Sequence, residues 1–523
     1  MRLPDSIFTV IQSAPQLTTN AESSAAKRSA AWLFVLLSCV YTLASSGRVR
    51  TPDEYMPFFQ AQSLVEHGST TIPQAVQFGD LYGAFDRDGH PRAPYPAGQA
   101  FLSVPLLMLG KFLLTRLPGV PTTPGAVFYI QVFGAVLTSA FAAAAAMAFF
   151  FLTTFRLGVS LRNALLATLC VAFGTLIFPY SGYFFSEPFT ALIMMAAVYV
   201  VVSHSTQMSG RNALVMGLLL GLAIWIRPTM VFATGMFALG MLLRDGIAGL
   251  RRAVVVCAIP AISGLLYLLS NKIVFGRAFN FGYPETEEML GKHLNSFHTP
   301  FYVGLTGFLV SPGKSIFVFT PVLLLAIFGM RRLWSRDRAV ATVSAGLPLL
   351  YLLFYMRYTQ WEGGVCPGPR YLLPFLIVTC VPVGLLLETG QLRFRQWLLV
   401  LTAAGFAVQV ITYSTSFLED QAVSTGAYYD FKLNYRMSYD PLVSQTKRLI
   451  EYLAGKPASL GFGFDRWFVF LHKMGIATSA ELLIAAVPLL LFLFSLSRLR
   501  RLLAQDRPSG LKPRESVVSF TPS

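Results

Sequence analysis

The stretch Arg50-Thr51-Pro52-Asp53-Glu54-Tyr55 follows directly after the first long apolar run of the chain, residues 30–46. A charged sequence of this kind marks the point at which a membrane-spanning segment ends, because ionised side chains are costly inside a bilayer. Two adjacent carboxylates at a membrane surface also need an explanation of their own. The fold therefore depends on how the later apolar runs are arranged relative to this stretch.

The composition is that of a membrane protein. Of the 523 residues, 54% are hydrophobic and only 13% are charged, and the mean hydropathy is +0.58, whereas a soluble protein carries roughly 25% charged residues. We therefore expect an all-α polytopic membrane protein. The net charge of +16 is explained by arginines that fix membrane orientation rather than by nucleic-acid binding. Five scattered cysteines without a C-x-x-C pair predict neither a disulfide framework nor a zinc site.

Twelve apolar runs are long enough, or nearly long enough, to cross a bilayer as helices. Several are shorter than a full span, so we expect their ends to extend into flanking residues. The sequence thus predicts about twelve transmembrane helices (11–13), centred on residues 30–46, 125–154, 161–179, 187–203, 213–226, 229–243, 253–271, 315–330, 339–356, 371–388, 397–413 and 479–497.

Basic residues give the orientation. If the twelve runs span, the arginine clusters all fall on one side, and the positive-inside rule makes that side the cytoplasm. We expect residues 1–29 to form a disordered cytoplasmic leader before an uncleaved signal anchor, and residues 498–523 to form a basic cytoplasmic tail after the last helix. The clusters are Lys27/Arg28, Arg156/Arg162, Arg211, Arg244/Arg251/Arg252, Arg331/Arg332/Arg336/Arg338, Arg393/Arg395 and Arg498/Arg500/Arg501.

The opposite, outer side collects the longer and less basic loops. The first of them, residues 47–124, is the largest, and residues 414–478 form a second long loop after a core domain of residues 30–413. Residues 98–115 are also apolar, but a span there would move nearly all later arginine clusters outside. We therefore expect 98–115 to be an interfacial or re-entrant helix on the outer face. The same loop is expected to contain an amphipathic segment over 56–67 and a hairpin around the turn Asp86-Arg87-Asp88-Gly89.

The acidic residues of the outer side have two explanations each. Thr51-Pro52-Asp53-Glu54 fits a helix-capping box with Pro52 at the first helical position and Glu54 at the third. This role is compatible with chemistry, because a helix start holds a carboxylate rigidly at the membrane surface. Glu187 lies where the fourth span re-enters the membrane. It is a functional candidate by position, or an acidic residue in the first turn of a helix capped by Ser186.

Three outer cations are candidates for anion binding. The string Trp361-Glu362-Gly363-Gly364-Val365-Cys366-Pro367-Gly368-Pro369-Arg370-Tyr371 predicts a tight loop that delivers Arg370 to the tenth span. A guanidinium there suits a phosphate, which it can bind in a bidentate way; the alternative is a buried arginine paired with a loop carboxylate. Arg227 interrupts an apolar run, and Lys314 lies in a Ser-Pro-Gly-Lys-Ser sequence that lacks the pattern of a nucleotide P-loop.

The sequence predicts no metal site. Asp86-Arg87-Asp88 matches a D-x-D metal motif, but the glycine that follows favours a plain hairpin turn. The six histidines show no metal-ligand spacing, and no G-x-S-x-G sequence indicates a hydrolase. We expect that no cofactor is required, although a divalent cation could supplement the arginines.

Several short motifs occur together. An outer Asp-Glu pair follows the first span at once, and the loop after it contains Asp88-Gly89, Tyr95-Pro96-Ala97-Gly98-Gln99 and Val104-Pro105. A later outer acid and the string ending in Gly368-Pro369-Arg370-Tyr371 complete the set. This set resembles the GT-C superfamily of integral-membrane glycosyltransferases. Within it, the chain is most similar to bacterial enzymes akin to protein O-mannosyltransferases and to the aminoarabinose transferase for lipid A, over about residues 30–390.

The resemblance implies a sugar donor linked to polyprenyl phosphate and met on the periplasmic face of the bacterial inner membrane. It implies that Asp53, with Glu54 beside it, is the general base toward an acceptor hydroxyl, and that the anomeric carbon is inverted. Glu187 lies near a second acidic position of the family but departs from it, since it begins the fourth span and precedes a proline. Arg370 would hold the carrier phosphate, and the other candidates for substrate binding are Tyr371, Trp361, Arg227, Lys314 and Tyr95.

Other classes of function compete with this one. A transporter or flippase of a lipid-linked anion would explain the spans and the arginines, but not the 78 residues of loop 47–124. A structural partner in envelope assembly is a third possibility. The sequence leaves open the sugar, the acceptor (lipid, glycan or protein) and the oligomeric state.

The expected path of residues 98–115 can be tested with topology reporters. An alkaline phosphatase fused after Thr122 should be active, and a green fluorescent protein at the same point should be dark, because we expect both to lie in the periplasm. The reverse pattern would show that residues 98–115 cross the membrane.

Overall fold

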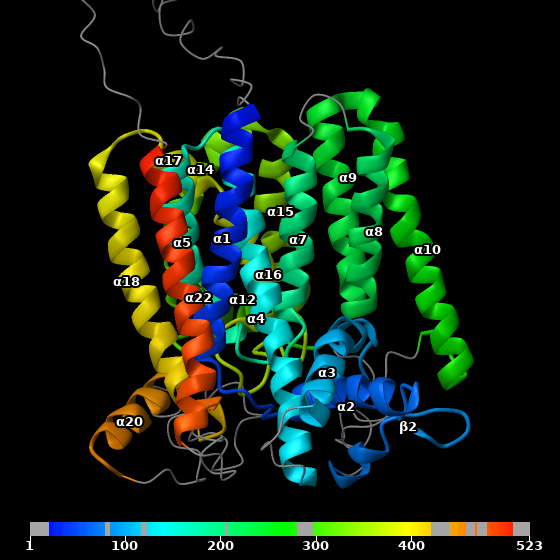
Figure 1. Ribbon diagram of the computed structural model, residues 1–523. Helices are drawn as coiled ribbons and strands as arrows, with labels where there is room; N and C mark the ends of the chain where they lie inside the picture. Colours follow the sequence, from blue (N-terminus) through cyan, green and yellow to red (C-terminus); the bar gives the residue numbers. More distant parts are fainter. Residues whose placement is uncertain are drawn as a thin grey trace, which may run out of the picture.

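A computed structural model describes residues 20–78, 84–116, 123–203, 208–279, 297–419, 440–456, 466–467 and 478–505. In this part of the chain, long helices stand side by side as a bundle, and shorter helices and loops form a layer at its lower end (Figure 1). Most of the expected leader and tail, at 1–19 and 506–523, and much of the outer loop 414–478 lie outside the described residues.

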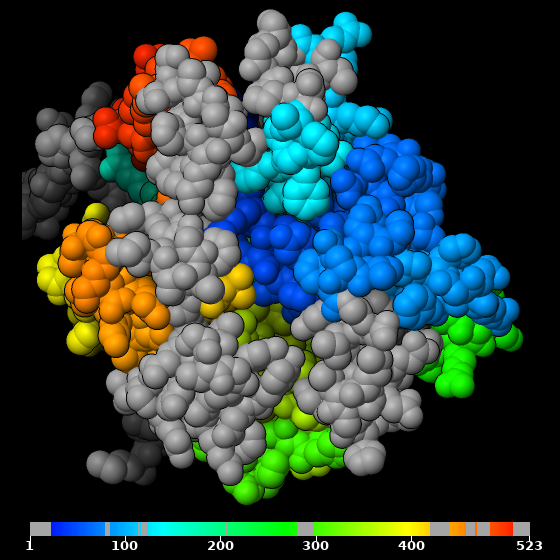
Figure 2. Space-filling model, turned by 90° about the horizontal axis from the view of Figure 1, so that it is seen from below, coloured from blue at the N-terminus to red at the C-terminus, as the bar shows by residue number. Residues whose placement is uncertain are grey.

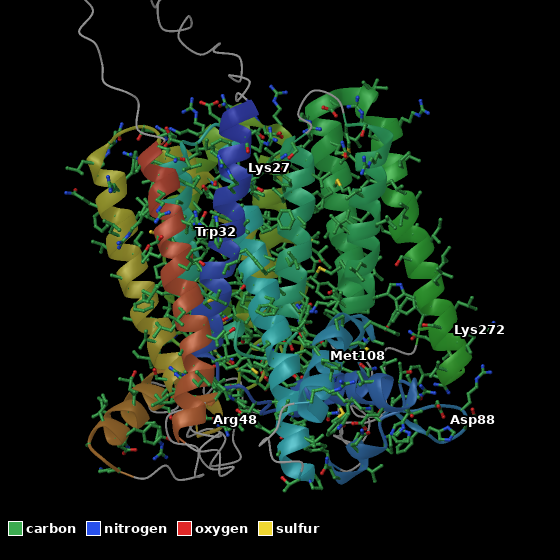
Figure 3. The ribbon with its side chains drawn as sticks, viewed as in Figure 1. Lys27, Trp32, Arg48, Asp88, Met108 and Lys272 are labelled. Atoms are coloured by element: carbon green, nitrogen blue, oxygen red, sulfur yellow. The ribbon has the colours of Figure 1, made fainter. Side chains whose placement is uncertain are left out.

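The first long loop stays at the lower end. Helix α1 (Asn20–Ala44) descends through the bundle, and α2 (Pro52–His67) and α3 (Gly98–Arg116) lie together at its foot, beside the beginning of α4 (Pro124–Arg156), which runs back up (Figure 1). Lys27 accordingly lies at the upper end, and Arg48 and Asp88 lie at the lower end (Figure 3). This position of α3 agrees with the expectation that residues 98–115 do not cross the bundle.

The loop contains the expected local elements. Helix α2 ends at Gly68, whose φ of 63° places it in the left-handed region that favours glycine. A short 3-10 helix η2 (Pro73–Phe78) follows. Strands β1 (Ala84–Phe85) and β2 (Pro91–Arg92) then pair antiparallel, with Ala84 opposite Arg92 and Phe85 opposite Pro91. The hairpin predicted around the Asp-Arg-Asp-Gly turn is therefore confirmed.

The remaining helices continue the bundle and its connections. In chain order they are α5 (Leu161–Gly174), α6 (Ile177–Tyr180), α7 (Glu187–Ser203), α8 (Gly210–Ile226), η4 (Pro228–Met230), α9 (Val231–Asp245), η5 (Gly246–Gly249), α10 (Leu250–Phe275), α12 (Phe301–Val310), α13 (Ile316–Phe319), α14 (Leu323–Arg336), α15 (Arg338–Tyr355), η6 (Arg370–Leu372), α16 (Leu373–Thr379), α17 (Pro382–Leu387), α18 (Leu392–Ser414), η7 (Phe417–Glu419), α20 (Pro441–Leu453) and α22 (Thr478–Gln505).

The chain is a multi-pass helical membrane protein. In the described residues, six helical segments are long and apolar enough to cross a membrane, and five shorter apolar helices accompany them. All twelve predicted runs coincide with helices, but those at 161–179, 315–330 and 371–388 are each divided into two pieces. Prolines at positions 321 and 382 account for the last two breaks. The outer loop 272–314 also contains α12, a helix that the pattern of spans did not predict.

The arginine-rich helix ends gather at the upper end of the bundle. Contacts there join the beginning of α1, the end of α4, the beginning of α5, the end of α14 and the end of α22. The expectation that these basic ends share one side is confirmed, while its assignment to the cytoplasm stays a prediction. The contacts are Arg156 to Ser23, Arg162 to the carbonyl of Leu503, Arg336 to the carbonyl of Leu157, and Arg244 to Asp337.

Small residues allow the helices to approach closely, as is common in membrane bundles. Helix α4 packs against α1 and α7, and many of its buried residues are alanines, among them Ala140, Ala143 and Ala144. Where α18 crosses α5, a Cβ atom added to Gly405 would overlap the carbonyl oxygen of Gly174. Glycine is therefore required at position 405 by contact with another backbone.

We predict that Gly405→Ala lowers the melting temperature in detergent, at a cost of about 1–3 kcal/mol, because α18 and α5 must move apart. The matched control is Gly264→Ala in α10, where an added Cβ meets nothing within 4 Å. That variant should be unchanged or slightly more stable, since glycine weakens a helix interior. Equal melting temperatures for the two variants would contradict the close packing of α18 on α5.

Candidate active site

Glu54 anchors the beginning of α2. Its carboxylate accepts hydrogen bonds from the backbone N–H groups of Arg50 (2.9 Å) and Thr51 (3.2 Å) through Oε2, and from that of Phe184 (2.9 Å) through Oε1. The bond from Thr51 is the capping interaction that the sequence predicted. The bond from Phe184 ties α2 to the segment that precedes α7. Glu54 is completely buried, so its oxygens hold the backbone rather than face an open space.

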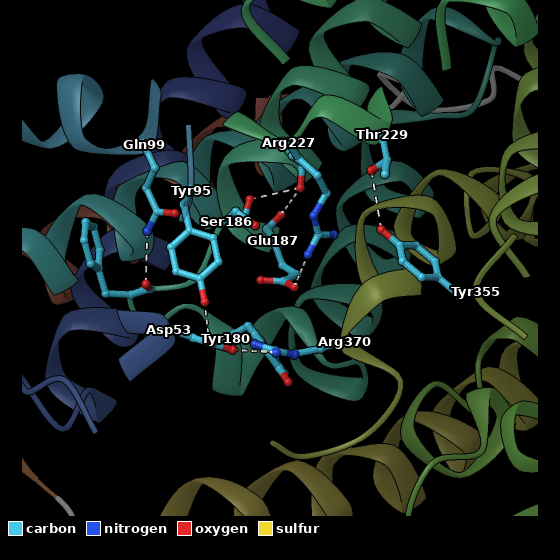
Figure 4. A network of polar contacts seen from close by, with 12 residues as sticks. Asp53, Tyr95, Gln99, Tyr180, Ser186, Glu187, Arg227, Thr229, Tyr355 and Arg370 are labelled. Carbon is cyan, nitrogen blue, oxygen red and sulfur yellow. Dashed lines mark hydrogen bonds and ion pairs between the residues drawn. The ribbon is translucent and has the colours of Figure 1, made fainter. Parts of the chain in front are cut away.

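Asp53, the preceding residue, has a different environment. Its side chain is 33% exposed, and its two oxygens have different partners. Oδ1 accepts a hydrogen bond from the hydroxyl of Tyr95 at 2.5 Å, and Oδ2 accepts one from Nη2 of Arg370 at 2.6 Å. Tyr95 comes from the loop before α3, and Arg370 from the beginning of η6. The carboxylate is therefore oriented from two sides while one part of it stays accessible (Figure 4).

The surroundings shift the pKa values of the two acids in opposite directions. Burial dominates at Glu54 and raises the pKa of this carboxyl, against the charge of Arg50 and the backbone hydrogen bonds. Burial also acts to raise the pKa of Asp53, but the charge of Arg370 and the hydrogen bonds from Tyr95 and Arg370, with a further contribution from the charge of Arg227, lower it below its ordinary value. Asp53 is thus the more readily ionised acid of the pair.

The glycine-rich loop fixes Arg370. Gly363 has a φ of 72°, and a Cβ atom there would come within 2.9 Å of the Arg370 side chain, so only glycine fits where that side chain crosses the loop. Lys314 lies completely buried behind the loop and donates hydrogen bonds to the carbonyls of Gly364 (2.8 Å) and Cys366 (2.7 Å). These contacts hold the loop in the shape that directs Arg370 toward Asp53.

A second ion pair lies beside the first. Glu187, at the first position of α7, accepts a hydrogen bond of 2.8 Å from Nη2 of Arg227, which lies between α8 and η4. The Glu187 side chain is only 1% exposed. Both residues were candidates from the sequence, but their pairing was not foreseen. Figure 4 shows the two pairs converging on one region from four separate segments of the chain.

Aromatic rings line the two guanidinium groups. The Cζ atom of Arg370 lies 5.1 Å from the ring centre of Tyr371, and that of Arg227 lies 5.4 Å from the same ring. Phe185 lies against Arg370, with 4.9 Å between Cζ and the ring centre, and Tyr355 stacks on Tyr371 at 4.7 Å. These contacts stabilise each cation and keep its plane fixed.

The structure therefore brings together six of the nine site residues expected from the sequence: Asp53, Tyr95, Glu187, Arg227, Arg370 and Tyr371. Glu54 and Lys314 lie next to them but bind backbone groups. Trp361 is 1% exposed and packs against Phe308 of α12, so its contacts support the loop. The sequence reasoning missed Phe185 and Tyr355 as partners of this region. The aromatic run before Glu187 was the available signal for Phe185.

The hairpin turn is a separate acidic cluster. Carboxylate or imidazole atoms of Asp86, Asp88 and His90 lie within 4.8 Å of one another. The carboxylate of Asp86 already has partners. It accepts hydrogen bonds from the backbone N–H groups of Asp88 and His90, and it forms an ion pair with Nε of Arg92 at 2.9 Å. The geometry is that of the plain turn that the sequence favoured, and the cluster alone does not indicate a metal.

The region around the two ion pairs contains groups that can take part in acid–base and charge-stabilising chemistry. It contains a partly accessible carboxylate whose pKa is lowered, and two guanidinium groups, at most 14% exposed, that lie against one aromatic ring. It lies toward the lower end of the bundle. Figure 2 shows dark-blue residues from the early part of the chain at the centre of the lower face, next to yellow-green residues that the bar places between 300 and 400. This combination can remove a proton from one group and stabilise negative charge on another.

No protein-family model and no curated protein sequence matches the chain. Among solved structures it is similar to ArnT from Cupriavidus metallidurans bound to undecaprenyl phosphate, with 14% identity and a TM-score of 0.47 over 91% of this chain and 76% of the other. It is also similar to the oligosaccharyltransferase of Archaeoglobus fulgidus tethered to an acceptor peptide, with 10% identity and a TM-score of 0.46 over 82% of this chain and 57% of the other. Both are GT-C glycosyltransferases, the class that the sequence motifs resemble. At these TM-scores the likeness by itself assigns neither fold nor activity.

The buried position of Glu54 predicts a cost of substitution. Glu54→Gln should lower the melting temperature by the equivalent of about 1–3 kcal/mol, because an amide NH₂ cannot accept a bond that a buried backbone N–H group needs. The matched control is Asp88→Asn, which removes an exposed carboxylate from the hairpin of the same loop and should leave the melting temperature nearly unchanged. The measurement is thermal unfolding of both variants in one detergent. Equal melting temperatures for the two variants would contradict the structural role of Glu54.

Proposed function

We propose that the chain is a glycosyltransferase that moves a sugar from a polyprenyl-phosphate carrier to an acceptor hydroxyl at the outer face of the bacterial inner membrane. The observation that supports this proposal is the contact between the partly exposed Asp53, whose pKa is lowered, and the buried Arg370 at the lower end of the bundle. A base and a phosphate ligand are the two groups that the reaction needs. The donor class comes from the motif resemblance described above.

In the proposed reaction, Asp53 accepts the proton of the acceptor hydroxyl. The acceptor oxygen then forms a bond to the anomeric carbon, while the bond between that carbon and the phosphate oxygen breaks, so the configuration at this carbon inverts. The electron pair of the broken bond stays on the phosphate. Arg370, with Arg227 nearby, stabilises the negative charge on this leaving group. The step is balanced without a cofactor.

The membrane location favours this reaction. The isoprenoid tail of the donor stays in the bilayer, so the protein has only to position the sugar–phosphate bond beside the base. Holding the two reactants in one orientation supplies a large part of the rate enhancement. Glu187 neutralises Arg227 and fixes its direction, and we assign it this positioning role rather than the role of base.

The base assignment is tested by Asp53→Asn in reconstituted vesicles that contain a polyprenyl-phosphate sugar. We expect sugar transfer to fall by roughly 10²–10⁴-fold, the usual contribution of a general base, with the protein still folded and still binding donor. The matched control is Asp88→Asn, which removes an exposed carboxylate from the hairpin of the same loop and should leave transfer unchanged. Assays with and without EDTA show whether a divalent cation contributes. Full transfer by Asp53→Asn would overturn the assignment.

A further inference from the structure

We propose that the donor phosphate displaces Asp53 from Arg370, so that binding of the lipid-linked donor is the event that frees Oδ2 of Asp53 to act as the base. This inference rests on the proposed function. It concerns the order of events at the site, and it assigns separate roles to the two ion pairs and to Tyr95.

The charges of the two ion pairs offset each other. Two carboxylates and two guanidinium groups form two pairs, with N–O distances of 2.6 Å for Asp53 and Arg370 and 2.8 Å for Glu187 and Arg227. A sugar phosphodiester adds one further negative charge. Because the carboxylates offset both guanidinium groups, this charge meets little net attraction there. It is attracted strongly only by a cation that is released from its present partner.

The two pairs differ in how easily they can open. If Glu187 lost Arg227, it would remain as a buried charge without compensation, since its side chain is only 1% exposed. Asp53 is 33% exposed, so once released it can be solvated or can bind the acceptor hydroxyl. The pair that opens is therefore Asp53–Arg370, and Arg227 stays neutralised by Glu187.

Unused donors on both arginines point to the same ligand. Among the described residues, Nε of Arg370 and Nη1 of Arg227 are buried and have no hydrogen-bond partner. Buried N–H groups of this kind are costly unless a partner satisfies them. Both guanidinium groups lie against the ring of Tyr371. A phosphate has enough oxygens to accept from both, and its charge makes these hydrogen bonds strong.

Tyr95 makes the exchange productive. Its hydroxyl donates to Oδ1 of Asp53, whereas Arg370 binds Oδ2. When Arg370 moves to the phosphate, Oδ1 remains held and Oδ2 is the oxygen that becomes free. The acceptor proton then passes to Oδ2, which lies next to the newly bound phosphate. Tyr95 is thus a positioning residue that acts through Asp53.

The first test measures binding of sugar-free undecaprenyl phosphate to the purified full chain in lipid nanodiscs. If Asp53 competes with the phosphate, Asp53→Asn should bind this probe at least about fivefold more tightly than the wild type, a usual size for coupling between two ligands. Arg370→Ala should bind it more weakly. Asp88→Asn, which removes a carboxylate outside the site, should bind it as the wild type does.

The second test compares two pH profiles of sugar transfer. In the free protein, Asp53 faces Arg370 from η6, Tyr95 from the loop before α3 and the charge of Arg227 from between α8 and η4. On its own helix α2, the next residue is Glu54. Loss of Arg370 to the donor raises the pKa of Asp53, and the base works only when ionised. The acid limb of kcat, which reports the donor complex, should therefore lie at higher pH than that of kcat/KM, which reports the free protein. Tyr95→Phe should lower kcat more than it changes KM.

The outcomes separate the two proposals. If the wild type and all three binding variants fail to bind undecaprenyl phosphate, the proposed function itself is contradicted. If the wild type binds the probe but Asp53→Asn binds it equally well or more weakly, the exchange is wrong while the proposed function stands. Acid limbs of kcat and kcat/KM at the same pH would also overturn the exchange.

Discussion

The ion pair between Asp53 and Arg370 is the interaction on which the rest of the site depends. It joins residues that are 317 positions apart in the chain, one in the loop after the first span and one at the beginning of a late span. Each partner is fixed by its own surroundings, Asp53 by the helix start that Glu54 holds and Arg370 by the glycine-rich loop that Lys314 supports. A short contact between two rigid partners requires both supports, because a buried charge tolerates little displacement from its counter-charge.

Much of this arrangement follows from the sequence, for identifiable reasons. Apolar runs and arginine clusters are local properties, so they predicted the helices, the shared basic end and the loop that contains α2 and the hairpin. Asp53, Glu187, Arg227 and Arg370 were found because a charge beside an apolar run is rare. Their partners were not found, since a pairing across hundreds of residues depends on helix packing. The breaks within three expected spans were missed because hydropathy does not register a local loss of backbone hydrogen bonds.

The sequence favoured Asp53 over Glu54 only through a resemblance, and the structure adds that the two acids have different surroundings. Both fit the beginning of a helix, and either can serve as a base by composition. The backbone of Phe184, which comes from a distant segment, makes the difference because it occupies Glu54. The neighbouring residue then points to Tyr95 and Arg370. Glu54 holds the beginning of the helix through backbone hydrogen bonds, and this fixes the direction of the neighbouring, accessible side chain of Asp53.

The pairing of charges also follows from the membrane. An arginine at the edge of the hydrocarbon region needs a counter-charge, and in the proposed function a phosphate supplies it only while the donor is bound. The chain meets this requirement in two ways. Arg227 has the permanent partner Glu187, which is almost inaccessible to solvent. Arg370 has the partner Asp53, which remains accessible. In the proposed function, the carboxylate that stabilises Arg370 in the empty protein is the same one that accepts the proton during transfer. Arg370 needs the charge of Asp53 until a donor phosphate takes its place, so in this proposal Asp53 becomes available as the base only when the donor is bound.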